Sequence, residues 1–550
     1  MEKESIMTEP NAKKPPEPPA KTAFSDQPYA LYCDGYECTD RGVRTKNGRV
    51  VCLHPIMPVA AVEDVEDHTV SLTVAYNAKG YWEEHTYPRT LLASGTAILS
   101  LSAAGVAVTS ENARALSAYL TALYHMNDHI LPKKWSMTHL GWVSKYSNLF
   151  APYAENVCYA GDASMDLKLD AVHFSGDDRR WAEAVLPVWK GSLAARLTLA
   201  AAFGSVLLTK LDLQPFFVHI WGRTGLGKTV LLQLAASVWG DPAPGRLIST
   251  FNATATGLET TAAFLHDLPL LVDELQIVSG PGKSDFQQTV YTLAEGVGKT
   301  RGAKDGGLRK QPTWRNIIIT SGERPISADG VGGGAMNRCI ELELTAPITD
   351  DFAGLLDVIS LNFGAPGYYF VEFMKKHEKV LPEQLRKYTR ELTDAGVTGK
   401  QAAAMAALRL ADAACCLCFF TENGKRPRPL TAEQVVPLLL ANTDVCMEEK
   451  ALEYLFDTIA ANPAHFPVTV DAQRPVEVWG KPVGEYTAVI GKVFNSIMEE
   501  GGFSPRAVLA YADRKGLLDK DQDQYKKIVS IYGKNVRCAI IRNPQKETNP

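Results

Sequence analysis

The sequence has no apolar run close to the roughly 18 residues that a membrane-spanning helix requires. It begins with charged residues and has no apolar signal region, so we expect a cytoplasmic protein without a membrane partner. Cysteine is scarce and irregularly spaced, with 10 residues among 550, which excludes a disulfide framework. A basic excess is also missing, because the net charge is −5. Any contact with nucleic acid must therefore come from local basic patches.

One cluster near the start of the chain contains residue types that bind metals, namely Cys33, Cys38, Cys52 and His54. Their spacing matches no common zinc pattern. Free cysteine behaves mostly as a small buried apolar residue. We therefore expect these thiols to be buried in strands.

A phosphate-binding pattern lies near the middle of the chain, directly after the apolar run 216–221. In the pattern G-x-x-x-x-G-K-T, the glycines let backbone N–H groups surround a phosphate, the lysine reaches the terminal phosphates and the last hydroxyl binds magnesium. The apolar helix expected over 229–239 adds its N-terminal dipole. The expected nucleotide-binding residues are Gly222, Arg223, Thr224, Gly225, Leu226, Gly227, Lys228 and Thr229.

An acidic pair follows a second apolar run, residues 268–272. Asp273 is expected to hold magnesium together with Thr229, and Glu274 to act as the general base for the attacking water. The alternative is a buried strand that ends in an exposed acidic pair. The adjacent Asp-Glu favours ATP hydrolysis over phosphate transfer to a substrate. The expected cofactors are ATP and Mg²⁺.

Three polar residues close other expected strands. Thr320 and Ser321 end the apolar run that begins at Ile317, and either hydroxyl could lie beside the γ-phosphate as a sensor. The alternative is an ordinary strand end. Asn252 closes the strand expected over 246–251, and we expect it to pair with Glu274.

Two basic regions stand out in this acidic chain. Residues 296–310 hold five glycines and five basic residues, which fits either a solvated flexible loop or contacts with DNA phosphates. Residues 476–542 have a helix-helix-wing pattern, with Ser504 capping the second helix, Pro505 beginning it and Gly516 ending it. The candidate DNA contacts are Lys299, Arg301, Lys304, Arg309, Lys310, Arg506, Arg514, Lys515 and Lys534.

The order of these patterns predicts an α/β protein whose parallel sheet is covered by helices on both faces. Strand-like alternation before the core predicts a β-rich domain, and the strand-poor stretch after it predicts a helical lid. The expected parts are a disordered tail (1–27), an N-terminal α+β domain (28–176), the P-loop core (177–349), the lid (350–465) and a winged-helix-like domain (466–550).

Several of these motifs together resemble the Domain of Unknown Function 927 family. They are the apolar strand and P-loop 217–229, the stretches 236–242 and 252–259, the acidic strand 270–274 and Thr-Ser-Gly-Glu-Arg-Pro at 320–325. The resemblance covers about residues 48–345 and, more loosely, the chain from Trp479 onward. Members occur in bacterial mobile elements and phages, and some in staphylococcal chromosome cassettes are similar to the minichromosome-maintenance class of AAA+ proteins.

The resemblance implies an AAA+ ATPase core and a self-loading hexameric helicase that acts on single-stranded or forked DNA, with other replication proteins of the element as further partners. It also implies three arginine roles. Arg338, before the last core strand, matches the finger that enters a neighbouring subunit's site, with Arg324 as the runner-up. Arg409, in the expected lid, matches a second sensor. The bland alternative for Arg338 is a surface ion pair with Glu341 or Glu343.

Three functions remain open at this point. The first is an oligomeric motor that translocates on DNA. The second is an ATP-gated DNA-binding switch or loader that separates no strands. The third is a nucleotide-binding structural protein, against which Glu274 argues because a general base implies turnover.

Overall fold

The computed structural model describes residues 20–250, 253–274, 283–302, 307–308, 311–326, 336–420, 425–441, 447–467, 477–522 and 524–544. The chain forms two compact units. The first comprises Met1–Val172 and Ala263–Leu268, and the second comprises His173–Ala262 and Pro269–Pro550.

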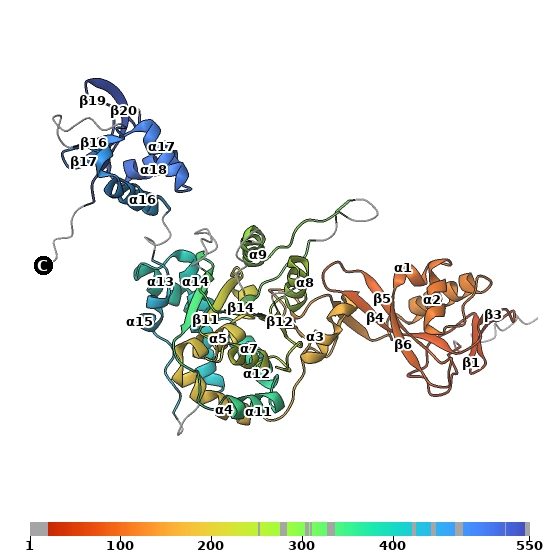
Figure 1. Cartoon of the computed structure of the whole chain (residues 1–550). Helices are drawn as coiled ribbons and strands as arrows, with labels where there is room; N and C mark the ends of the chain where they lie inside the picture. The colour runs from red at the N-terminus through yellow and green to blue at the C-terminus, as the bar shows by residue number, and fades with distance from the viewer. Residues whose placement is uncertain are drawn as a thin grey trace, which may run out of the picture. The chain divides into compact units, whose positions relative to one another are not determined.

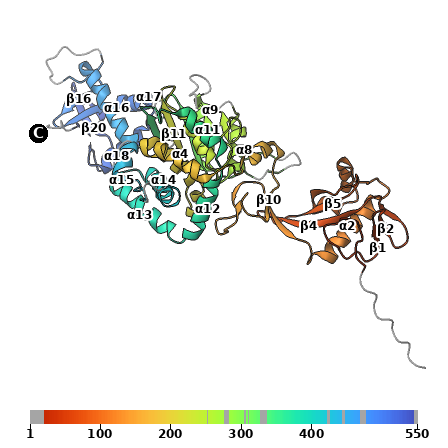
Figure 2. The same ribbon diagram turned by 90° about the horizontal axis from the view of Figure 1, so that it is seen from below.

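The first unit is built on a five-stranded sheet of order β10-β7-β4-β5-β6. β5 pairs antiparallel with β4 and β6, whereas β7 runs parallel to both β4 and β10. Helix α2 lies beside β4, as Figure 2 shows. The bounds are β4 (Ile56–Asp64), β5 (Val70–Tyr76), β6 (Glu83–Pro88), α1 (Arg89–Leu92), α2 (Ala113–Asn127), β7 (Lys133–Met137), β10 (Val157–Tyr159) and α3 (Asp166–Ala171).

Smaller elements complete this unit, and they confirm the expected β-rich character. A three-stranded antiparallel sheet comprises β1 (Tyr36–Thr39), β2 (Gly42–Thr45) and β3 (Val50–Cys52), and a hairpin comprises β8 (Gly141–Trp142) and β9 (Phe150–Ala151). The expected burial of Cys33, Cys38 and Cys52 is confirmed, and all three are free thiols. Among the described residues, no cluster of three or more metal-ligating side chains is arranged to hold a metal.

The predicted boundary of the tail at residue 27 is too late. Phe24 is buried in the core of the first unit, and Lys21 forms a bridge with Tyr32. Thr22 is also buried, and its hydroxyl accepts a hydrogen bond from the Leu31 amide. A single aromatic anchor and a few backbone bonds are therefore enough to fix residues 20–27 despite their polar composition.

The second unit contains a parallel five-stranded sheet of order β12-β13-β14-β11-β15, which confirms the predicted α/β core. Its inner strands are buried on both faces, and helices α5 and α7 pack on them (Figure 1). The bounds are α4 (Asp178–Gly191), α5 (Leu193–Gly204), α6 (Leu207–Leu211), β11 (Phe216–Gly222), α7 (Lys228–Ser237), β12 (Ile248–Thr250), α8 (Ala255–Leu265), β13 (Leu270–Asp273), α9 (Lys283–Glu295), β14 (Ile317–Gly322) and β15 (Cys339–Leu344). The end of α8, from Ala263 onward, is assigned to the first unit.

The chain continues from β15 into the helices predicted for the lid. These are α11 (Phe352–Leu361), α12 (Ala365–His377), α13 (Leu381–Asp394), α14 (Gly399–Cys418) and α15 (Ala432–Val435). Helix α14 packs against α12, α13 and the core helix α5. It is long and apolar enough to cross a membrane by length and composition, but 78% of its apolar window is buried inside the fold, as in a core helix.

The C-terminal part forms the helix-turn-helix and wing that the sequence predicts. Ser504 is the N-cap of α18, as expected. The hairpin β16–β17, which precedes the helices, was missed because it is short and carries little apolar alternation. The bounds are α16 (Met447–Ala461), β16 (Gly480–Val483), β17 (Tyr486–Ile490), α17 (Gly491–Glu500), α18 (Pro505–Arg514), β18 (Leu518–Asp519), β19 (Lys527–Ile531) and β20 (Lys534–Arg542).

The predicted division between lid and winged helix at residue 465 is wrong. Ala451 and Leu455 of α16 are buried in one cluster with Phe494 of α17 and Val508 of α18. Helix α16 is thus the first helix of the C-terminal fold, because its apolar face is covered by α17 and α18.

Candidate nucleotide site and nucleic-acid interface

The P-loop owes its shape to glycine. Gly225 and Gly227 have φ angles of +87° and +96°, which residues with a side chain rarely adopt. A Cβ atom on Gly227 would lie 2.5 Å from Cε1 of Phe352, and one on Gly222 would lie 2.6 Å from the Leu344 carbonyl oxygen. Conformation and close packing therefore both require glycine at the positions that the motif assigns.

Lys228 and Thr229 lie in the first turn of α7, where free backbone N–H groups favour an anion. The Lys228 ammonium donates to the carbonyl oxygens of Gly222 (2.7 Å) and Arg223 (2.9 Å). The cation is thus held against the loop that would surround a phosphate. Loop, lysine and hydroxyl come together as the sequence predicted.

The acidic pair and one sensor candidate, Ser321, meet at the carboxyl end of the parallel strands, where the P-loop also lies. Strand β14 lies between β11 and β13, which places Ser321 between the P-loop strand and Asp273. The Ser321 hydroxyl donates to Oδ1 of Asp273, and the Glu274 amide donates to the same oxygen (3.0 Å) and to Ser321 Oγ (3.1 Å). These three residues therefore form one hydrogen-bonded group.

Glu274 has an unusual backbone. Its φ angle is +55°, in the left-handed region, and its side chain is exposed. Such a conformation in a residue other than glycine costs on the order of 1–3 kcal/mol and persists where surrounding contacts impose it. The two hydrogen bonds of its amide are contacts of this kind, so the turn after β13 is specifically shaped.

Thr320, the other sensor candidate, is buried like Ser321 but does not join this hydrogen-bonded group, and its role as a sensor stays a prediction. Its side chain is buried, and Oγ1 lies 2.8 Å from Nδ1 of His219. Nε2 of His219 lies 2.9 Å from the Arg324 carbonyl oxygen, which can only accept. Nε2 therefore carries the proton, and the Thr320 hydroxyl donates to Nδ1. Burial lowers the pKa of His219 to about 4, which keeps the ring neutral.

The structure adds a contact that the sequence did not single out. The Thr224 hydroxyl of the P-loop donates to Oε1 of Glu323, just beyond β14 (2.9 Å). A third carboxylate therefore lies at the P-loop, in addition to Asp273 and Glu274. Its only signal in the sequence was its position directly after the predicted sensor strand.

The two arginine-finger candidates, Arg324 and Arg338, lie at opposite ends of the parallel strands. Arg324 follows β14 and is exposed at the edge of the P-loop. Arg338 precedes β15, whose first residue is level with Phe217, so it lies about 20 Å, the length of β11, from that edge. Nη1 of Arg338 is 3.9 Å from Oε1 of Glu295, a neighbour that the sequence did not predict. Arg338 cannot reach the phosphate site of its own subunit.

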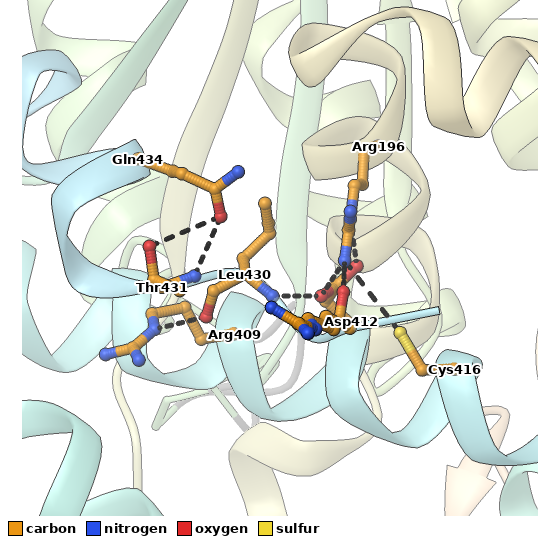
Figure 3. Close-up of polar contacts among 8 residues, drawn as sticks. Arg196, Arg409, Asp412, Cys416, Leu430, Thr431 and Gln434 are labelled. Atoms are coloured by element: carbon orange, nitrogen blue, oxygen red, sulfur yellow. Dashed lines mark hydrogen bonds and ion pairs between the residues drawn. The ribbon is translucent and has the colours of Figure 1, made fainter. Parts of the chain in front are cut away.

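Arg409 is not placed as a second sensor, and this prediction is corrected. Its side chain is only 5% exposed. Its guanidinium donates to the Leu430 carbonyl oxygen (3.1 Å; Figure 3). It also donates to Oε2 of Glu391 (2.9 Å) and stacks on the Tyr388 ring. Its donors are used inside the lid, because α14 turns this residue inward.

A neighbouring arginine joins the lid to the core (Figure 3). Arg196 of α5 binds Asp412 of α14 through Nε (2.6 Å) and Nη2 (2.8 Å), and it also donates to the Arg428 carbonyl oxygen (2.7 Å). Asp412 is fully buried and accepts a third bond, from the Leu430 amide (2.8 Å). This two-bond ion pair fixes α14 on α5.

The basic loop folds back on itself as a hairpin. Antiparallel bridges join Val297 to Thr313 and Gly302 to Leu308. Lys299 is exposed, but Nη2 of Arg301 donates to Oε2 of the buried Glu259 (2.8 Å). The expectation that Arg301 offers its charge to DNA is therefore revised. Four predicted site residues lie outside the described ranges, namely Asn252, Lys304, Arg309 and Lys310.

The C-terminal candidates are available to a ligand. Arg506 lies in the first turn of α18, Arg514 is its last residue and Lys515 its C-cap, and Lys534 is the first residue of β20, next to the turn after β19. All four are exposed. The neighbouring Lys526 is different, because its ammonium donates to the Gly491 carbonyl oxygen (2.9 Å) and to Asn495 (2.8 Å). The second helix and the wing tip thus present the basic groups, as in winged-helix DNA binders.

The comparisons agree with this architecture. Residues 27–314 match the domain of unknown function DUF927, and residues 446–546 match the Cch helix turn helix domain. A solved structure described as "SCCmec type IV Cch - active helicase" has 17% sequence identity and a TM-score of 0.67, covering 92% of this chain and 97% of that chain. At this identity the likeness shows a shared fold.

A second solved structure is much less similar. The "A form apo structure of NrS-1 C terminal region-CTR" has 9% identity and a TM-score of 0.31, covering 88% of this chain and 95% of that chain, which is too weak to carry an argument. No curated protein matches the chain. The DUF927 match spans more than half of the 550 residues and includes the P-loop, the acidic pair and the base of the basic hairpin. The chain belongs to the DUF927 family.

Proposed function

We propose that this protein is an ATP-hydrolysing AAA+ motor that acts on DNA, as a hexameric replicative-type helicase of a mobile genetic element. One observation carries the proposal. Ser321 is hydrogen-bonded to both Asp273 and the Glu274 amide, beside the P-loop on the same edge of a parallel sheet. A site that only holds a nucleotide has no need for this shaped acidic turn.

The residues fit magnesium-bound ATP. Thr229 and Asp273 provide the hydroxyl and carboxylate oxygens that Mg²⁺ prefers, and the left-handed glycines open the loop amides to phosphate. When bound, the metal would neutralise charge on the phosphates. Lys228 would bind the terminal phosphates, Ser321 would hold Asp273 in place, and Glu274 would accept the proton of the attacking water.

DNA as the partner is supported by two basic regions in a chain of net charge −5. They are the exposed residues of α18 and the wing, and the hairpin that bears Lys299. The fold is shared with a protein described as an active helicase. A ring is supported by Arg338, which is too far from its own P-loop and would complete a neighbour's site. Replication proteins of the same element are the further partners we propose.

We propose five parts for the chain, corrected for the structure. They are the segment before residue 20, an N-terminal domain from residue 20 to residue 172, the P-loop core to residue 349, a lid to residue 441 and a winged helix from residue 447.

The test is a forked-duplex unwinding assay with ATP, run beside an ATPase assay with and without the same DNA. A helicase hydrolyses ATP faster with DNA and separates the strands. Stimulation without strand separation supports the second candidate, an ATP-gated switch or loader, which the helix-turn-helix match favours. Failure of DNA to bind or stimulate would refute both.

A further inference from the structure

The base of the basic hairpin is tied to one face of helix α8. Nη2 of Arg301 donates to Oε2 of Glu259 (2.8 Å) and lies 3.3 Å from the Thr256 hydroxyl. The Lys299 amide donates to the same Glu259 oxygen (3.4 Å). On the exit side of the hairpin, the Asn316 side chain donates to the Ala262 carbonyl oxygen (3.2 Å). Both arms of the hairpin therefore contact α8.

These contacts follow helical spacing. Thr256, Glu259 and Ala262 are three residues apart, so they lie on one face of α8. The Glu259 side chain is 3% exposed, and a buried carboxylate needs a partner. The hairpin approaches Glu259 closely at Gly298, where a Cβ atom would lie 3.1 Å from Glu259 Oε2. Glycine at this position leaves room for that contact. Glu259 is thus built into the hairpin base.

Arg301 and Lys299 differ in what they offer to a ligand. The Arg301 side chain is 34% exposed and its charge is matched by Glu259. Lys299 uses only its backbone amide at Glu259, and its side chain is exposed. Two basic residues in one arm therefore have separate roles, one as an anchor and the other as a charge open to phosphate.

The anchor is directly linked to the catalytic edge. Helix α8 leads into β13, which ends at Asp273, and the exit arm of the hairpin leads into β14, which carries Ser321. Asp273 and Ser321 are hydrogen-bonded to each other. Both strands that hold the hydrolytic group therefore follow, in the chain, segments that make contacts at the hairpin base.

We propose that Glu259 is a positioning residue that fixes the hairpin through Arg301 and couples DNA on the hairpin to ATP hydrolysis. This proposal rests on the DNA-dependent ATPase function above. Glu259 touches neither DNA nor nucleotide in this role. Arg301 is the anchor, and Lys299 is the phosphate contact.

The test compares Glu259→Gln, Arg301→Ala and the matched control Lys299→Ala, which removes a basic side chain two residues away. The first measurement is hydrogen exchange of residues 297–302 and 311–313 without DNA. Glu259→Gln and Arg301→Ala should each exchange about tenfold faster or more, the double variant no faster than either, and Lys299→Ala like the parent. Arg301→Lys, which keeps the charge but loses the fork, should be intermediate.

The second measurement is DNA binding against salt, together with the ratio of DNA-stimulated to basal ATPase rates. Lys299→Ala should flatten the salt slope by about one unit, whereas Glu259→Gln should keep the slope and lower the stimulation ratio. Tighter DNA binding by Glu259→Gln would overturn the proposal, because it would show that Glu259 withholds Arg301 from DNA. Unchanged exchange in Glu259→Gln would also overturn it. If the parent binds no DNA, the proposed function fails, while the exchange result still decides whether Glu259 fixes the hairpin.

Discussion

At the scale of single residues, the hydrolytic group depends on a backbone conformation as much as on side chains. Glu274 is held at a φ angle of +55° by hydrogen bonds from its amide to Asp273 and Ser321. The turn aims Glu274 away from the buried strand while Asp273 remains at its end. Two adjacent carboxylates can thus take different roles, one at the metal and one at the water.

This division predicts different defects for two substitutions. Lys228→Ala should abolish nucleotide binding, since its ammonium neutralises phosphate charge. Glu274→Gln should bind ATP normally and lose about 10²-fold or more of the hydrolysis rate, because only proton transfer is removed. Equilibrium binding of a fluorescent ATP analogue and steady-state ATPase assays measure the two effects. Near-parent hydrolysis by Glu274→Gln would shift the base assignment to Glu323, the other carboxylate at the P-loop.

His219 predicts how the core responds to pH. Its native pKa is about 4, below the ordinary value near 6.5 in the unfolded chain, so the unfolded state binds the extra proton. The contribution to stability is complete above about pH 6.5 and is lost as the pH falls toward about 4, by about 3 kcal/mol in total. Urea unfolding of the parent and His219→Gln at about pH 7 and about pH 5 measures it. An equal loss in both proteins would contradict the assignment.

The sequence predicted the candidate site residues that local pattern determines, and the structure places them beside one another. The glycines, Lys228 and the acidic pair are dictated by motif spacing. The sequence could not decide whether Thr320 or Ser321 contacts the acidic pair. Adjacent residues of a strand point to opposite faces of the sheet, and the sequence does not show which strands flank β14. It placed Arg409 wrongly for a related reason, since its partner Glu391 belongs to another helix.

At the scale of elements, the ion pair between α5 and α14 holds the lid on the core. Asp412 is fully buried, so Asp412→Asn leaves Arg196 without its counter-charge and should cost about 3–5 kcal/mol. The control is Glu372→Gln, whose partner Lys375 lies on the same helix α12 near the surface, and which should cost less than about 1 kcal/mol. Urea unfolding of both variants measures the difference. Equal costs would mean that α14 is held by apolar packing alone.

Helices and strands were predictable where one hydrophobic pattern continues over the whole element. Apolar runs predicted the strands of the core, and apolar residues at helical spacing predicted its helices and the pair α17–α18. The boundaries between domains were less predictable, because they depend on which helix covers the apolar face of another helix. Helix α16 has the composition of a lid helix, and only the contacts of Ala451 and Leu455 assign it to the C-terminal fold.

At the scale of the whole molecule, the parallel sheet separates two arginines that the sequence treated as alternatives. Strands β11 and β15 run in the same direction, so Arg338, the residue before β15, lies at the amino end of the strands, opposite the end that carries the P-loop. Arg324 follows β14 beside the P-loop, whereas Arg338 is too far from the P-loop of its own subunit to act there, so the finger role that we propose for Arg338 requires a second copy. If the protein works as a ring, each site is completed by the neighbour's Arg338.

A mixing experiment tests this arrangement. One subunit carries Lys228→Ala and keeps Arg338, and the other carries Arg338→Ala and keeps its P-loop. A finger acting in trans is worth on the order of 10³ in rate, so each variant alone should be nearly inactive and the mixture should recover ATPase activity. Recovery follows because intact P-loops meet intact arginines only at mixed interfaces. No recovery in mixed oligomers, shown to form by co-purification of differently tagged subunits, would leave Arg338 as a surface partner of Glu295 and make Arg324 the residue to test next.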